Sequence, residues 1–424
     1  MSEWKEYKLG DVLLSANTGL DAIKRAPIVS INTGIKCLRI QDVSQEKKYN
    51  DWGFTQVLEN NFEKFKLLKN DIIVARTGAT VGVNLIINSN LNSVFNNGLI
   101  RLRVKDDFDS VYISYLLRSS SYWNHINSIA FGTTSQPNIQ INQLLDYRIK
   151  VPNSKSTQTA IAEILSSLDD KIELNNKINQ ELENLAQTLF KQWFIDFEFP
   201  NENGAPYKSS GGEMVDGQLG EIPMGWKVKT LDDVSNITIG RTPPRQEYQW
   251  FSKDVNDVKW ISIRDMGNCG TYIHSTSEYL TEEAVRHFNV PVINSNTVII
   301  SFKLTVGRIS ITTERMLSNE AIAHLNLKDS EIYPEFLYLF LKQFNFDSLG
   351  STSSIATAVN SKSIKSLPFI YPSKEILSRF KEVLVPIFSR IHNLTFENKE
   401  IVSLRDEMLP KLITGELEIN EITN

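Results

Sequence analysis

The amino-acid sequence repeats itself after about 220 residues, and this repeat constrains the fold most, because a duplicated chain folds as two similar units. Trp4 and Lys5 return as Trp226 and Lys227. The segment KCLRIQDV, which begins at Lys36, returns as KWISIRDM from residue 259. Each copy of this segment is typical of a short buried strand that ends near an aspartate.

Two further pairs of segments follow the same repeat. Each copy holds a β-branched strand that leads into a polar, cationic turn, and later a turn rich in Gly, Ser and Thr. These segments are residues 71–82 and 131–135 in the first copy and residues 297–308 and 349–353 in the second. A hydrophobic strand then ends at Pro152 or at Pro372, so each copy predicts a separate globular domain.

A long helix is predicted after each of these prolines, because apolar residues recur there at alternating spacings of four and three. Eight of ten such positions are apolar in each segment. A heptad pattern sustained over four to five repeats is typical of a coiled coil rather than of an ordinary amphipathic helix. We therefore expect the two helices to pack on each other as an antiparallel coiled coil.

Four polar residues interrupt the two seams: Asn175, Asn179, Asn398 and Arg405. Asn179 and Asn398 occupy equivalent positions, where an asparagine fixes the register of a coiled coil at a cost in stability. Alternatively, the seam opens locally and both side chains are solvated. Pro386 lies inside the second helix and predicts a kink or a new start of the helix there.

These patterns predict an α+β fold, with two similar domains of mixed helix and strand separated by the two long helices. In chain order we expect a first domain (1–152), a spacer helix (153–198), a linker (199–225), a second domain (226–372) and a C-terminal spacer helix (373–424). The linker is rich in Gly, Pro and Ser and lacks periodicity, which indicates no packed element.

Composition and motifs exclude several classes of protein. A hydrophobic content of 41% and a net charge of −5 favour a globular protein without a basic field for nucleic acid. Cys37 and Cys269 are too few for a disulfide framework or a zinc site, and no signal peptide or membrane span is evident. We therefore expect a cytoplasmic protein.

Catalytic and metal motifs are also missing from the sequence. It has no Gly-Lys-Ser/Thr phosphate loop, no Asn-Pro-Pro-aromatic motif and no His-Glu-x-x-His pair, so we expect no active site and no metal site. The five histidines are expected to be structural or exposed. Asp42 and Asp265 recur in the repeat, but a role in capping the turn after the strand is favoured over catalysis.

Five aromatic residues gather at the end of the first long helix and just after it: Phe190, Trp193, Phe194, Phe197 and Phe199. We interpret them as core rather than as a ligand site. Alternatively, they form part of a surface that receives a partner.

Several motifs distributed along nearly the whole chain resemble one family. They are the Trp-Lys start of each copy, the turn Gly240–Pro244, the strand Trp260–Asp265, the helix opening Gln158–Leu165 and the linker Gly212–Trp226. Together they resemble the specificity subunit of type I restriction-modification enzymes, which act in phage defence. One departure is Asn17–Leu20, which replaces the Gly-x-Thr-Pro turn that the second copy keeps.

The resemblance implies a non-catalytic subunit whose two target recognition domains each read one half of a bipartite, asymmetric site in double-stranded DNA. It also implies that the helical spacer docks two methyltransferase subunits, which bind S-adenosylmethionine and methylate adenine. A further motor subunit would use ATP and Mg²⁺ to translocate and restrict DNA. The chain itself would hold no cofactor.

Candidate DNA contacts come from the turns, since Arg, Asn and Gln read base edges while Lys, Ser and Thr hold phosphates. In the first domain they are Arg76, Thr77, Thr80, Thr133, Thr134, Ser135, Gln136 and Asn138. In the second they are Arg241, Arg245, Lys303, Thr305, Arg308, Ser351, Thr352, Ser353 and Ser354. The alternative for each residue is ordinary polar loop chemistry.

Two other functions remain open from the residues alone. One is a coiled-coil scaffold whose two repeated domains bind proteins, which the near-neutral charge of the second domain favours. The other is a self-sufficient DNA-modifying enzyme with an unrecognised site. The polar, cationic turns at matched places in the two copies favour DNA recognition over both.

Overall fold

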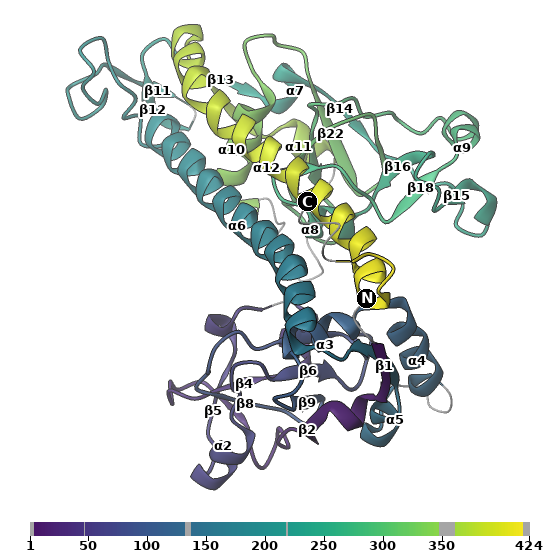
Figure 1. Ribbon diagram of the computed structural model, residues 1–424. Helices are drawn as coiled ribbons and strands as arrows, with labels where there is room; N and C mark the ends of the chain where they lie inside the picture. The colour runs from purple at the N-terminus through teal and green to yellow at the C-terminus, as the bar shows by residue number, and fades with distance from the viewer. Residues whose placement is uncertain (1–3, 46, 132–136, 218, 347–360, 419–424) are drawn as a thin grey trace. The chain divides into compact units, whose positions relative to one another are not determined.

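The computed structural model describes residues 4–45, 47–131, 137–217, 219–346 and 361–418 (Figure 1). The chain divides into two compact units, each of which contains one copy of the repeat and a part of both long helices. Unit 1 comprises Met1–Ile172 with Glu400–Asn424, and unit 2 comprises Glu173–Lys399. No described helix is long and apolar enough to cross a membrane.

Unit 1 is built on two four-stranded sheets and one strand pair. In spatial order the first sheet is β2 (Leu13–Thr18), β9 (Leu99–Val104), β6 (Ile72–Ala75) and β7 (Asn84–Ile86). The second is β3 (Ile28–Val29), β5 (Phe54–Thr55), β4 (Lys36–Leu38) and β8 (Ser93–Phe95). The pair is β1 (Trp4–Lys8) with β10 (Arg148–Pro152). This antiparallel pair ties the two ends of the repeat together.

Short helices connect and cover these sheets. They are η1 (Leu9–Val12), α1 (Ile40–Ser44), η2 (Tyr49–Asp51), α2 (Glu59–Phe65), α3 (Ser110–Leu116), α4 (Ser120–Ala130) and α5 (Ile141–Leu145). All four residues of β6 are buried, as expected for a β-branched strand covered on both faces. Asp109 and Ser119 cap α3 and α4, because each side chain accepts a hydrogen bond from the backbone N–H three residues later.

Unit 2 repeats this plan. Its larger sheet is β14 (Ser235–Ile239), β22 (Ile322–Leu327), β19 (Val298–Ser301), β20 (Ile309–Thr312) and β17 (Tyr272–Ile273). Its smaller sheet is β15 (Phe251–Ser252), β18 (Glu278–Leu280), β16 (Val258–Ile261) and β21 (Leu317–Ser318). The terminal pair is β13 (Lys227–Thr230) with β23 (Pro368–Tyr371). The strand orders match those of unit 1 with β17 added, so the repeat and the predicted α+β class are confirmed.

The helices of unit 2 follow the strands in the corresponding places. They are α7 (Leu231–Val234), η3 (Tyr248–Trp250), α8 (Ile263–Asn268), α9 (Glu282–His287), α10 (Pro334–Gln343) and α11 (Ser361–Lys365). In particular, α10 follows β22 as α3 follows β9.

The two long helices are α6 (Lys155–Phe194) and α12 (Lys374–Thr414), drawn in teal and yellow in Figure 1. Within unit 2, Asn175 contacts Asn398, whereas the ring of Phe194 lies 4.7 Å from that of Phe380. Residues early in the unit 2 part of α6 therefore contact residues late in the unit 2 part of α12, so the pair is antiparallel. Within unit 1 the direction is the same, since Asp169 contacts Arg405 and Leu165 shares a core with Leu412.

The seam asparagines are hydrogen-bonded between the helices. Asn175 is fully buried, and its Nδ2 donates to Oδ1 of Asn398 at 2.9 Å. Asn398 in turn donates to Asn176 at 2.8 Å, while Nδ2 of Asn179 donates to Thr395 at 3.4 Å. Asn398 thus pairs with Asn175 rather than with Asn179, and the role of these residues in fixing the register stays a prediction.

One alternative for Pro386, a new start of the helix, is excluded, and the expectation for the linker was wrong. A new start of the helix at Pro386 does not occur, because α12 is continuous through it and buried Leu384 and Phe388 hold both sides to the core of unit 2. The linker does hold a packed element, the antiparallel hairpin β11 (Met214–Gly217) and β12 (Gly220–Pro223). Buried Phe199 also stacks on Trp226 at 5.2 Å. Single aromatic residues therefore pack this segment, and they leave no periodic pattern in its sequence.

One histidine is buried in the larger sheet of unit 2. His324 on β22 lies between two hydroxyls, with Nδ1 3.1 Å from Oγ1 of Thr238 and Nε2 2.7 Å from Oγ of Ser318. Burial lowers the pKa of His324 to about 4, because the charged ring would lose its hydration. The neutral imidazole satisfies both hydroxyls, so His324 has a structural role, as the sequence predicts.

This burial predicts a pH dependence of stability. Below about pH 6.5 the unfolded chain binds a proton at His324 that the folded chain does not, so the free energy of unfolding falls as the pH drops toward 4. His324→Gln should reduce the loss of stability between pH 7 and pH 5 by about 2 kcal/mol. Urea unfolding of both proteins at several pH values measures it, and parallel profiles would contradict the assignment.

Candidate nucleic-acid interface

The turn after β6 in unit 1 brings several of the candidate DNA contacts together. Thr77 forms an isolated β-bridge with Asn138, and the N–H of Gly78 donates to the Pro137 carbonyl at 3.1 Å. Gly82 has a φ of 89°, and a β-carbon there would lie 2.8 Å from Cγ2 of Ile126. The glycines therefore let the turn fold tightly against α4 and the segment after Pro137.

Arg76 uses its side chain to hold this turn in place. Its Nε donates to the Ile139 carbonyl at 3.2 Å, and Nη1 donates to the Asn97 carbonyl at 3.4 Å. Thr80 lies half-buried in the same turn. The other first-domain candidates, Thr133, Thr134, Ser135 and Gln136, lie outside the described residues.

The turn after β19 in unit 2 exposes Lys303, Leu304 and Thr305. Leu304 is 95% exposed and has a φ of 63°, a left-handed conformation that is costly for a branched residue. Arg308, at the end of the turn, donates from Nη1 to the Ile263 carbonyl and fills the space beside Gly267. Arg308 therefore fixes the turn as Arg76 does in unit 1, while Lys303 and Thr305 remain accessible.

A second loop of unit 2 follows β14. It begins at Gly240, where a β-carbon would lie 2.2 Å from the Ser318 hydroxyl oxygen, so only glycine fits. Arg241 donates to the Phe288 carbonyl through Nη1. Arg245 packs over the rings of Phe251 and Trp260, at 4.4 and 4.7 Å.

Two carboxylates interact with the cations of this region. Glu278 binds both terminal nitrogens of Arg245 at 3.1 Å. Burial on its own would raise the pKa of Glu320, but the hydroxyl of Thr242 and the charges of Lys303 and Arg245 hold that pKa below its usual value. Glu320 is therefore bound by the loop after β14 through Thr242 and is influenced by the charge of Lys303 in the turn after β19.

The remaining second-domain candidates are Ser351, Thr352, Ser353 and Ser354, and all four lie outside the described residues. Among the described candidates of unit 1, the structure gathers Arg76, Thr77, Thr80 and Asn138 at one turn. In unit 2 the charges of Arg245 and Lys303 both lower the pKa of Glu320.

The acidic partners of these cations were missed from the sequence. Glu278 lies 33 residues from Arg245, and Glu320 lies 78 residues from Thr242. No local pattern links residues so far apart, so the sequence held no signal that pointed to them. A DNA phosphate carries the same charge as these carboxylates, so it can compete with them for the same cations.

The other sequence expectations concern residues away from these turns. Oδ2 of Asp42 accepts from the N–H of Arg39 at 3.0 Å, and Oδ2 of Asp265 accepts from the N–H of Ser262 at 2.8 Å. Both aspartates thus cap the strand-to-helix turn, as predicted. The five aromatic residues between Phe190 and Phe199 are buried in the core of unit 2, which confirms their interpretation as core.

Comparison with known proteins identifies a family. Residues 1–184 and 223–405 match the family described as "Type I restriction modification DNA specificity domain". The HindI specificity subunit of Haemophilus influenzae is 28% identical over 98% of this chain and 100% of its own length. The MjaIX specificity subunit of Methanocaldococcus jannaschii is 28% identical over 82% of this chain and 78% of its own length.

A solved structure has a similar fold. The S subunit of a type I restriction-modification system from M. genitalium aligns with a TM-score of 0.55 and 18% sequence identity. The alignment covers 97% of this chain and 96% of that protein.

The packing of Arg245 predicts unequal effects of two substitutions. Arg245→Ala should lower the free energy of unfolding by about 1 kcal/mol or more, because it removes two cation–π contacts and the packing of the side-chain stem. Glu278→Gln should cost less than about 1 kcal/mol, since the ion pair is partly exposed. Urea unfolding compares them, and an equal or larger loss in Glu278→Gln would contradict this reading of the site.

Proposed function

Because the chain belongs to the family of type I restriction-modification DNA specificity subunits, we propose that it reads a bipartite, asymmetric DNA site, one half with each recognition domain. The observation that carries the proposal is the repeat itself. Two domains share one strand order, while the turns after β6 and β19 differ in sequence. A shared scaffold whose turns differ in sequence suits two domains that bind different half-sites.

The side chains around the turns support the proposal that the two domains recognise different bases. The first domain offers Asn138 and the hydroxyls of Thr77 and Thr80 around its turn, whereas the second offers Lys303 and Arg245. Asparagine suits adenine, and arginine suits guanine, while lysine and hydroxyls suit phosphates. The two half-sites would therefore differ in sequence.

We further propose that the chain is non-catalytic and docks two methyltransferase subunits on α6 and α12. Large apolar side chains are exposed on these helices, which suits cover by a partner protein: Leu174, Leu185, Val383, Val385, Phe396 and Leu404. The methyltransferases would bind S-adenosylmethionine and methylate adenine. A motor subunit would bind ATP and Mg²⁺, so the cofactors of the complex would belong to the partners.

An exchange of the first domain tests the assignment of half-sites. Residues 1–152 should be replaced by the same region of a relative with a different target, which keeps the pairing of β1 with β10 inside the exchanged part. Genome-wide mapping of adenine methylation should then show one changed half-site and one unchanged half-site. A change in both halves would contradict independent reading, and exchange of residues 226–372 is the matched control.

The length of the paired helices should set the gap between the half-sites. One heptad inserted after Ile172 in α6 and one after Glu400 in α12 would leave both the Asn175–Asn398 and the Asp169–Arg405 contacts intact. The insertion adds about 10 Å of helix. At about 3.4 Å per base pair, the preferred gap should grow by at most about three base pairs.

The same methylation mapping measures the new gap. A heptad inserted in α6 alone is the control, because it misaligns the seam and should abolish activity rather than lengthen the gap. A fully active double insertion with an unchanged gap would show that the helices do not set the spacing.

A further inference from the structure

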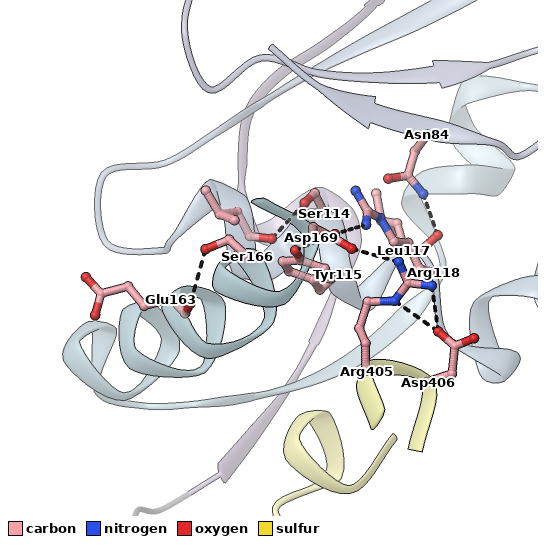
Figure 2. A network of polar contacts seen from close by, with 11 residues as sticks. Asn84, Ser114, Tyr115, Leu117, Arg118, Glu163, Ser166, Asp169, Arg405 and Asp406 are labelled. Carbon is pink, nitrogen blue, oxygen red and sulfur yellow. Dashed lines mark hydrogen bonds and ion pairs between the residues drawn. The ribbon is translucent and has the colours of Figure 1, made fainter. Parts of the chain in front are cut away.

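A carboxylate on α6 holds the first recognition domain. In unit 1 the hydroxyl of Tyr115 donates to Oδ2 of Asp169 at 2.7 Å, and Nη1 of Arg118 donates to the same oxygen at 3.0 Å (Figure 2). Arg405 of α12 donates to Oδ1 at 2.7 Å. These four residues form the first carboxylate network, which joins the end of α3 to both long helices.

The start of α3 is tied to α6 as well. The N–H of Asp109 donates to Oε1 of Gln158 at 2.9 Å, and the hydroxyl of Thr159 donates to Oδ2 of Asp109 at 2.9 Å. Because both ends of α3 contact α6, this short helix is fixed along the first turns of α6. The recognition domain carries α3 directly after β9, so the network fixes the placement of the domain on the helix.

The charge of Asp169 is secured by its surroundings. Burial on its own would raise the pKa of Asp169, but the hydrogen bonds from Arg405 and Tyr115 and the charge of Arg118 hold that pKa below its usual value. The carboxylate is therefore ionised at neutral pH. Its side chain is 27% exposed, so these charge-assisted hydrogen bonds are partly shielded from water.

Unit 2 contains a second carboxylate network, in which α10 takes the place that α3 has in unit 1. The hydroxyl of Tyr338 on α10 donates to Oε1 of Glu183 at 2.7 Å, and Nζ of Lys342 lies 3.1 Å from the same oxygen. Oε2 accepts from the hydroxyl of Thr271 at 3.2 Å. In unit 1 the tyrosine lies in α3 and the cation just after it, whereas in unit 2 both lie in α10. In each unit they bind one carboxylate, and the side chain of Glu183 is 13% exposed.

Both carboxylates belong to α6. Asp169 and Glu183 each follow a seam leucine, Leu168 or Leu182, and they are separated by two heptads, so they share one heptad position. If the two units used the helices in equivalent ways, the second carboxylate would lie on α12. Instead α6 supplies the anion for both domains, and α12 adds Arg405 to the first alone.

We propose that Asp169 and Glu183 are positioning residues that hold the two recognition domains on α6, and that they thereby set the gap at which two half-sites are accepted together. This inference rests on the proposed function. Neither carboxylate touches DNA in this scheme. Each acts through the recognition domain that it holds, so its loss should relax the choice of gap and leave the choice of bases unchanged.

The test compares variants of the full chain in complex with its methyltransferase partners. Asp169→Asn and Glu183→Gln keep the shape of the side chain and remove its charge. The matched controls are the exposed neighbours, Asp170→Asn and Glu181→Gln. Each complex is given duplexes that carry both half-sites with the native gap, with one base pair fewer and with one more, and the rate of adenine methylation is measured.

The wild-type complex and both controls should prefer the native gap strongly. Each network variant should reduce the ratio of native-gap to altered-gap rates by about tenfold, because shielded charge-assisted hydrogen bonds are lost. Discrimination against a mismatched base within either half-site should stay at the wild-type value. Tyr115→Phe and Tyr338→Phe remove one hydroxyl each and should relax the gap in the same direction, even where an acid variant folds poorly.

The outcomes separate this inference from the proposed function. A wild-type complex that accepts every gap, or that needs one half-site alone, would overturn the proposed function. If the wild-type complex prefers the native gap and all network variants prefer it as strongly as Asp170→Asn does, only the positioning role would be overturned. If those network variants also had a lower Tm, the networks would be contacts that stabilise the fold without setting the gap.

Discussion

The packing of each recognition domain against the two long helices is the constraint on which the structure depends. The core of unit 1 includes Ile161 and Leu165 of α6 together with Leu412 of α12. The core of unit 2 includes Phe190 of α6 and Phe380 of α12. Neither domain therefore completes its core from its own copy of the repeat. Each needs apolar residues from both helices, which ties the start of the chain to its end within unit 1.

This arrangement explains where polar groups are allowed near the seam. Asn175 is buried and pairs with Asn398, and Arg405 occupies a seam position because Asp169 lies beside it. A buried amide or cation without such a partner would destabilise the helix pair. The amide nitrogens of Asn175 and Asn179 and the guanidinium of Arg405 are each matched to a partner on the other helix.

The turns after β6 and β19 and the loop after β14 combine fixed and accessible cations. Arg76 and Arg308 donate to backbone carbonyls and shape their turns, whereas Lys303 is exposed. Arg245 is held between two rings and paired with Glu278. A side chain that is fixed in advance loses less conformational entropy when it binds a ligand.

The sequence by itself determined the repeat, the α+β class, the two long helices, the capping role of Asp42 and Asp265 and the aromatic core after Phe190. All of these follow from local spacing or from comparison of the chain with itself. Only the tertiary structure decided that Asn175 rather than Asn179 pairs with Asn398 and that Arg76 and Arg308 bind carbonyls. It also decided that Asp169 and Glu183 accept hydrogen bonds from Tyr115 and Tyr338. These contacts join residues that are distant in sequence, and the geometry that brings them together arises only when the helices and sheets pack.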